Sequence, residues 1–236
     1  MLKFIKRSFD MRILFKTNYK QDLNLAKHGG HRFWYGLLIL VLFAAPLILG
    51  GYYIGEATRI LIYAMAGLGL MVLTGFTGQV SLGHAAFLAI GAYTNAWFLA
   101  QGFSSFVALP MAALLSMIGG LLVAIPAARM SGIYLAIATL AFAIIVEDFA
   151  GHLNSITGGN RGMMVDVPTL FGYQIWESWE LYLFVLSILV VATLAVLNIL
   201  RSPLGRAMIA VRDSEVSSQA LGVNPMKIKV FAFTVS

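Results

Sequence analysis

Long apolar stretches separated by short polar segments are the dominant pattern of this chain. A helix needs about 20 apolar residues to cross the hydrocarbon core of a membrane. The candidate spans are Trp34–Ile54, Ala57–Phe76, His84–Ala100, Ser105–Ala128, Gly132–Ala150 and Leu181–Leu200. A seventh apolar segment begins near Ile228 and is cut off at Ser236, too early to cross a bilayer. The pattern therefore predicts an all-α integral membrane protein, a polytopic helical bundle of about six complete spans and a truncated seventh.

The composition agrees with a membrane protein. Hydrophobic residues occupy 60% of the 236 positions and charged residues only 11%, whereas a soluble domain carries about 25% charged residues. The chain has no cysteine, which excludes disulfides, thiolate chemistry and cysteine-based metal sites. The formal charge of +6 does not indicate nucleic-acid binding, because the basic residues are segregated along the chain and do not cover a soluble face.

Basic residues are concentrated before the first apolar segment. Residues 1–33 hold eight of the sixteen lysines and arginines. We predict a basic cytoplasmic N-terminal tail there, followed by a transmembrane domain over residues 34–236 that is incomplete at its C-terminus. In a helix, Leu2, Ile5 and Phe9 would fall on one side, which favours an interfacial helix on an anionic leaflet. A disordered basic tail fits the same residues equally well.

The distribution of lysine and arginine also predicts the orientation, because short loops rich in these residues stay in the cytoplasm. With the N-terminus inside, six alternating spans place fourteen of the sixteen basic residues on the cytoplasmic side. Arg59 and Arg161 are the two that fall outside. We therefore expect a multi-pass protein with a cytoplasmic N-terminus.

A glycine-rich polar segment interrupts the apolar pattern after the second span. In Gly75–Gly83, "GFTGQVSLG", glycines are interspersed with Gln79 and Ser81, and His84 follows directly. Irregular backbone at membrane depth is tolerated where protein buries it or where it lines a watery cavity, and broken helices recur in transporters. Ser81 is a candidate N-cap for the helix that begins at His84. A cytoplasmic turn between two spans is the alternative, and the spacing alone leaves both open.

Two further polar segments are candidates for function. The outer segment "NSITGGNRGMM" contains Thr157 and Gly159 beside Arg161. It either receives a substrate or a docking partner, or it is an ordinary exposed loop. The cytoplasmic segment 201–229 carries both charge signs on a helix-like pattern that Gly222 can end. It is either a solvated connection or a helix offered to a cytoplasmic partner.

Signatures of catalysis are missing from the sequence. It contains no HExxH zinc motif, no complete nucleophile elbow around Ser81 and no GxxxxGKS/T phosphate loop. We therefore expect that the chain is not an enzyme and binds no metal and no cofactor, so that partner subunits would hydrolyse any ATP.

An ion channel or a secondary transporter is an alternative of another class. The acidic residues lie only at the ends of the candidate spans, which argues against ion-coupled cycling.

Three polar segments with their flanking helices resemble one family, the LivM branch of ABC-importer permeases. In the order seen in that family, the chain has "TGFTGQVSLGHAAFLAIGAYTNA", then "SGIYLAIATLAFAIIVED" followed by "NSITGGNRGM", then "SPLGRAMIAVRDSEVSSQALGVNPMKIKVFAFTVS". The resemblance covers residues 57–236 and leaves the basic tail outside. It implies a permease subunit that passes branched-chain or related small amino acids inward across a bacterial inner membrane. A urea or short-chain amide permease of the same build is the alternative within transport.

The resemblance also implies partners and residue roles. The implied partners are membrane lipid, a LivH-type permease subunit, two ATP-binding subunits and a periplasmic substrate-binding protein. The residues assigned to the translocation path are Gln79, Ser81, His84, Thr157 and Gly159. The residues assigned to coupling with the ATPase are Arg212, Asp213, Glu215 and Gly222. The chain departs from the family at Val216, which stands where the coupling loop has its leading Glu, with Glu215 one residue earlier.

Overall fold

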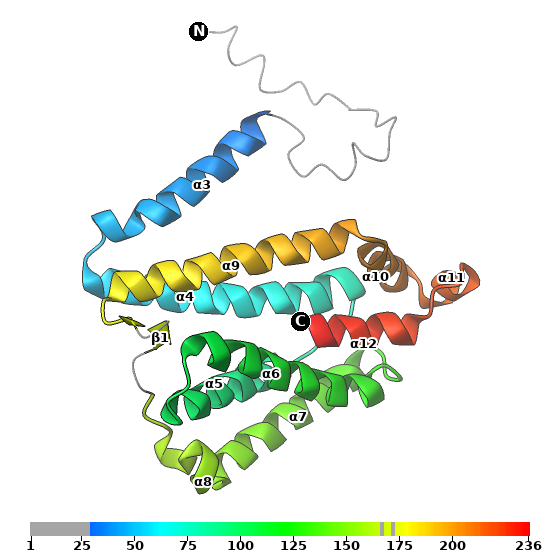
Figure 1. Cartoon of the computed structure of the whole chain (residues 1–236). Helices are drawn as coiled ribbons and strands as arrows, with labels where there is room; N and C mark the ends of the chain where they lie inside the picture. Colours follow the sequence, from blue (N-terminus) through cyan, green and yellow to red (C-terminus); the bar gives the residue numbers. More distant parts are fainter. Residues whose placement is uncertain (1–28, 166–167, 171–172) are drawn as a thin grey trace, which may run out of the picture. The chain divides into compact units, whose positions relative to one another are not determined.

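The computed structural model describes residues 29–165, 168–170 and 173–236, and most of them are helical (Figure 1). Residues 1–28, which make up most of the predicted basic tail, lie outside the described residues. The chain divides into two compact units, one that ends at Ala45 and one that runs from Pro46 to Ser236. All candidate site residues belong to the second unit.

Helix α3 spans Gly29–Ile48 and so includes the last residues of the predicted tail. A bend at Leu49 and Gly50 separates α3 from α4, Gly51–Leu70, whose N-cap is Gly50 in an extended conformation. The predicted first span, Trp34–Ile54, is therefore wrong at its end. Two successive glycines are poor helix formers because their backbone loses the most conformational freedom on folding, and the helix is interrupted there.

Four helical segments of the described chain are long and apolar enough to cross a membrane. They are α4 continued by the π-helix η1 (Gly51–Phe76), α6 (Ser105–Ala127), α7 (Ile133–His152) and α9 (Ser178–Arg201). Helix α5, His84–Ala100, is apolar but has only 17 residues, and the apolar part of α3 is shorter still. The structure agrees with an all-α membrane protein and does not confirm six complete spans.

Helices α4 and α9 pack side by side, α5 packs between α6 and α7, and the short helix α12, Pro225–Val235, packs on α6 (Figure 1). The starts of α4, α6 and α9 lie at one end of this unit, together with α8 (Asn154–Thr157). Helices α10 (Pro203–Asp213) and α11 (Glu215–Ala220) lie at the opposite end. The two polar regions singled out in the sequence, the outer loop and the mixed-charge segment, are thus at opposite ends of the helices.

A short irregular region links α7 to α9. After α8 it contains the 3-10 turn η2 (Gly159–Arg161) and an antiparallel hairpin of β1 (Thr169–Leu170) and β2 (Tyr173–Gln174). The Tyr173 hydroxyl donates to Glu180 Oε1 at 2.7 Å. This hydrogen bond to a carboxylate raises the pKa of Tyr173, and it fastens the hairpin to the first turn of α9.

Small residues let α6 and α12 approach closely. A Cβ on Gly120 would lie 3.0 Å from the Phe233 backbone oxygen of α12, and Ala124, one turn later, is completely buried. This agrees with the use of small residues at four-residue spacing where no hydrophobic force joins helices. Many large apolar side chains on α6, α7 and α9 remain exposed, such as Leu122, Ile145 and Val191. Lipid or partner subunits must cover these side chains.

Candidate functional site

The predicted glycine-rich break is present. Helix α4 passes into η1, Met71–Phe76, whose C-cap is Thr77; the chain is irregular from Gly78 to Gly83, and α5 begins at His84. The break is braced against α7, because Leu82 N donates to Thr139 Oγ1 at 3.0 Å. A Cβ on Gly83 would collide with the Thr139 backbone oxygen, so only glycine allows this approach.

Gln79 and Ser81 are buried inside the break, with 3% and 6% of their surface exposed. Gln79 Nε2 donates to Thr77 Oγ1 at 3.1 Å, but Gln79 Oε1 has no hydrogen-bond partner among the described residues. Ser81 is not the N-cap of α5, contrary to the sequence prediction. Gly83 takes that position without a capping side chain, and Ser81 Oγ instead accepts a long contact of 3.4 Å from Gly83 N.

The His84 side chain lies beside α4. Its ring hydrogen-bonds to the backbone of Ala66, and Nε2 would lie 3.0 Å from a Cβ on Gly69. The other ring nitrogen, Nδ1, is buried without a partner in the described part of the chain. Ala66 and Gly69 precede η1, so α5 starts beside the body of α4 and not beyond its end. The break therefore folds back between the helices.

The first half of the break contacts α10. Arg212 Nη1, from α10, donates to the Gly75 backbone oxygen at 2.9 Å. Gly78 has a φ of 68°, and a Cβ there would lie 2.9 Å from Arg212 Cγ. The first half of the break thus contacts the α10 region, whereas Gln79, Ser81 and Gly83 in the second half are buried.

The predicted coupling residues lie together around α10 and α11. Arg212 also pairs with Asp213 at 3.0 Å, and Glu215 pairs with Lys229 of α12 at 2.6 Å. Gly222 has a φ of 82° in the turn between α11 and α12. Lys229 is only 4% exposed. The sequence did not predict that this lysine is buried and forms an ion pair. Its signal was a lysine inside the otherwise apolar segment that follows Pro225.

In the outer loop, Thr157 has a structural role. Its single O–H is shared between the backbone oxygens of Ala150 and Leu153, which lie 2.6 and 2.7 Å from Oγ1, and the hydroxyl oxygen accepts from Gly159 N at 3.1 Å. The donor and one of the two acceptor lone pairs are thus engaged, and these contacts fix the loop to the end of α7. Among the described residues, neither Thr157 nor Gly159 hydrogen-bonds to Gln79, Ser81 or His84.

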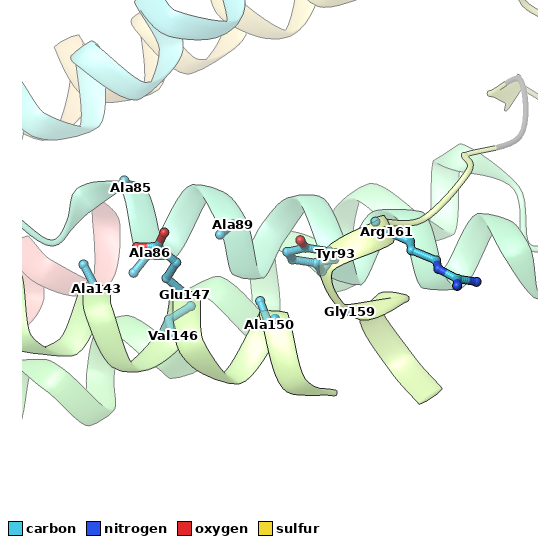
Figure 2. Close-up of a pocket in the computed structure, with 12 residues that line it drawn as sticks. Ala85, Ala86, Ala89, Tyr93, Ala143, Val146, Glu147, Ala150, Gly159 and Arg161 are labelled. Carbon is cyan, nitrogen blue, oxygen red and sulfur yellow. The ribbon is translucent and has the colours of Figure 1, made fainter. Parts of the chain in front are cut away.

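A cleft runs along α5 between these two regions (Figure 2). It has a volume of about 510 Å³ and is lined by α5, α7 and the loop around η2. Of the five residues assigned to the translocation path, Gly159 lines this cleft. Glu147, an acidic residue of α7 on the cleft wall, was not among the predicted site residues. Its signal was a charged residue within the candidate span Gly132–Ala150, close to the end of that span.

Comparison with known proteins identifies the family to which these segments belong. The family described as "Branched-chain amino acid transport system / permease component" matches residues 52–236. The chain belongs to this family. The match begins at the start of α4 and includes the break, the outer loop and the coupling segment. The resemblance noted in the sequence is confirmed.

Two relatives in the permease family are similar over most of this chain. Both are named "High-affinity branched-chain amino acid transport system permease protein LivM", one from Salmonella typhimurium and one from Escherichia coli. Each is 35% identical, over 84% and 86% of this chain and over 53% and 54% of the relative. The chain therefore spans about half the length of the relatives it matches. No solved structure matches the chain.

Proposed function

We propose that this chain is the permease subunit of an ATP-driven importer that moves branched-chain or related small amino acids into the cytoplasm. The family match over residues 52–236 carries the proposal, since the two relatives are named as permeases of branched-chain amino acids. At least four apolar helices of membrane-spanning length agree with a multi-pass protein of the inner membrane, and the lysine and arginine bias supports a cytoplasmic N-terminus.

The energy source lies in partner subunits. The sequence has no phosphate-binding loop of its own, so a pair of ATP-binding subunits would supply ATP hydrolysis. A LivH-type permease subunit would cover part of the exposed apolar surface, and a periplasmic binding protein would deliver the amino acid. Helices α10 and α11 are the proposed docking site for an ATPase subunit, because they present Arg212, Asp213 and Glu215 at one end of the helices.

The second half of the break would face the translocation path. Buried polar atoms without a partner are rare in folded proteins, and each calls for a water, a ligand or a partner group. Gln79 Oε1 and His84 Nδ1 are two such atoms, and Ser81 is buried beside them. In the assembled transporter, water or substrate would satisfy these groups. Gly159, with Thr157 fixing its backbone, would shape the outer end of the path.

A movement of α10 at the proposed docking site would be transmitted directly to the glycine-rich break. Arg212 is the residue that joins them, because it belongs to α10 and hydrogen-bonds to Gly75 of the break. The ion pair between Glu215 and Lys229 connects α11 to α12, which packs on α6. A displacement of α10 and α11 by an ATPase subunit would therefore shift both the break and α12.

Uptake by the assembled transporter in vesicles tests the function. We expect inward transport of leucine, isoleucine or valine that requires ATP and the binding protein. Uptake of urea or short amides without uptake of amino acids would favour the alternative permease of the same build. Solute flux that continues without ATP would favour a channel or a secondary transporter.

A further inference from the structure

The cleft between α5 and α7 is large enough for a small solute. Its volume of about 510 Å³ falls in the range of about 300–1,000 Å³ that is usual for small-molecule sites. The space exists because the two facing helices carry small side chains there, at Ala85, Ala89, Ala143 and Ala150. On the core side of the same helices, the rings of Phe87 and Phe142 pack with centroids 5.5 Å apart. The cleft is therefore confined to one side of the α5–α7 pair.

Two opposite charges line this cleft at different depths. Figure 2 shows Glu147 at the level of Ala86, and Arg161 at the other end of the cleft beyond Tyr93. Glu147 lies five residues before the end of α7, about 7 Å along the helix. Arg161 lies in the outer loop, at the mouth of the cleft.

Neither charge is neutralised by a residue that the structure describes. Some other charged groups of the described chain have partners: Glu56 pairs with Arg59, Asp148 with His152 and Glu215 with Lys229. No ion pair or hydrogen bond of the Glu147 or Arg161 side chain is found among the described residues. Glu147 is exposed and lies near the end of α7, and a carboxylate in a membrane-spanning segment is a candidate for a substrate or ion pathway.

The chemistry of the cleft fits an α-amino acid with an apolar side chain. A carboxylate attracts an ammonium group, a guanidinium attracts a carboxylate, and the alanine walls accept an aliphatic side chain. Because the two charges lie at opposite ends, they would act on the solute in succession, Arg161 first and Glu147 deeper. A neutral amide or urea would leave Glu147 without a counter-charge.

We propose that Glu147 binds the ammonium group of the transported amino acid in the α5–α7 cleft, after Arg161 has attracted its carboxylate at the mouth. This proposal rests on the proposed function and adds the two residues that would bind the charged groups of the zwitterion, which a neutral amide lacks. Binding is expected to be weak, since a solute that must pass through cannot be held tightly.

Transport by charge variants tests the proposal. Glu147→Gln keeps the size and removes the charge, and we expect leucine uptake at low concentration to fall at least about ten-fold, the loss of one charged hydrogen bond. Glu147→Asp should retain part of the activity, and Arg161→Gln should lower the rate mainly at low leucine concentration. Asp148→Asn is the matched control, because Asp148 is the next residue, pairs with His152 and does not line the cleft.

Leucine uptake by Glu147→Gln at the parental rate, with the complex assembled in normal yield, would overturn the proposal while leaving the permease function intact. A failure of the parental complex to transport any amino acid would instead remove the proposed function itself. A loss of assembled complex in Glu147→Gln, with Asp148→Asn unaffected, would show that the carboxylate contacts another subunit, and it would also overturn the proposal.

A chemical probe gives a readout that is independent of transport. The chain has no cysteine, so Ala89→Cys introduces a single thiol on the cleft wall. We expect cationic methanethiosulfonates to react faster than anionic ones of the same size, leucine to slow both, and the Glu147→Gln background to remove the preference. An unreactive thiol in the assembled complex, or equal rates for both reagents with no protection by leucine, would contradict a solute site.

Discussion

The guanidinium of Arg212 donates a hydrogen bond of 2.9 Å to the backbone oxygen of Gly75, across 137 positions of the sequence. The donor sits near the end of α10, and the acceptor lies where η1 gives way to the break. Gly78, with its φ of 68°, lets the break pass close to the Arg212 side chain. This contact makes Arg212 a direct structural link between the proposed ATPase docking site and the proposed path.

Removal of this link should uncouple hydrolysis from transport. We expect Arg212→Ala to lower amino-acid uptake per ATP hydrolysed by about ten-fold, because a charged hydrogen bond of about 1.5–3 kcal/mol is lost. The measurement is the ratio of uptake to phosphate release in vesicles. Lys227→Ala, which removes an exposed cation from α12, is the control. An unchanged ratio in Arg212→Ala would mean that the contact with Gly75 does not couple ATP hydrolysis to transport.

The ion pair between Glu215 and Lys229 should stabilise the packing of α11 on α12. Glu215→Gln leaves a nearly buried ammonium group without its counter-charge, and we expect a loss of about 1–3 kcal/mol. This is less than for a fully buried pair, because Glu215 is half exposed to solvent. Thermal unfolding of the purified complex measures the effect.

The double variant Glu215→Gln with Lys229→Met separates charge from packing. It removes both charges and keeps an apolar side chain of similar length, so the stability should return to near the parental value. ATPase crosslinking to α11 in the same variants reports on docking. If the double variant is as unstable as Glu215→Gln alone, the buried ammonium is not the cause.

Much of the helical architecture could be predicted from the sequence, because apolar runs of about 20 residues have few alternatives in lipid. The boundary at Gly50 was missed since the apolar run continues through the two glycines. The fold-back of the break was also beyond prediction. Its position depends on the contact of His84 with α4 and of Gly83 with Thr139, and local spacing does not report such long-range contacts.

The sequence located the polar segments that interrupt the helices, but it did not predict which contacts each candidate side chain makes. The hydroxyl of Thr157 fixes the outer loop by hydrogen bonds, and the hydroxyl of Ser81 does not cap α5. Glu147 was not predicted as a site residue because it lies near the end of an apolar segment, and charged residues are common at the ends of membrane spans. The cleft on which it lies requires two helices to come together, and only the structure provides that information.

The orientation of the helices can be tested with single cysteines, and the structure selects the positions. Gly159 is a poor probe because a Cβ there would collide with Asn154, and Ser218 is buried. Met164, in the outer loop, is 98% exposed, and Val216, on α11, is largely exposed. We expect an impermeant reagent to label Met164→Cys from outside the cell and Val216→Cys only after permeabilisation. The reverse pattern would overturn the orientation derived from the basic residues.

The buried polar atoms of the break give the last prediction. Gln79 Oε1 and His84 Nδ1 lack partners among the described residues, so Gln79→Ala and His84→Ala remove a buried polar group whose desolvation costs about 1–3 kcal/mol. If these groups serve only the fold, the variants should change stability, because Gln79 loses its bond to Thr77 and His84 its bond to Ala66, and assembled complexes should transport at the parental rate. If they meet water and substrate in the path, uptake should fall several-fold with complex yield unchanged. Gln101→Ala, an exposed amide just after α5, is the matched control. Parental rates in both variants would reduce the break to a turn that positions α5, and its assignment to the path would fail.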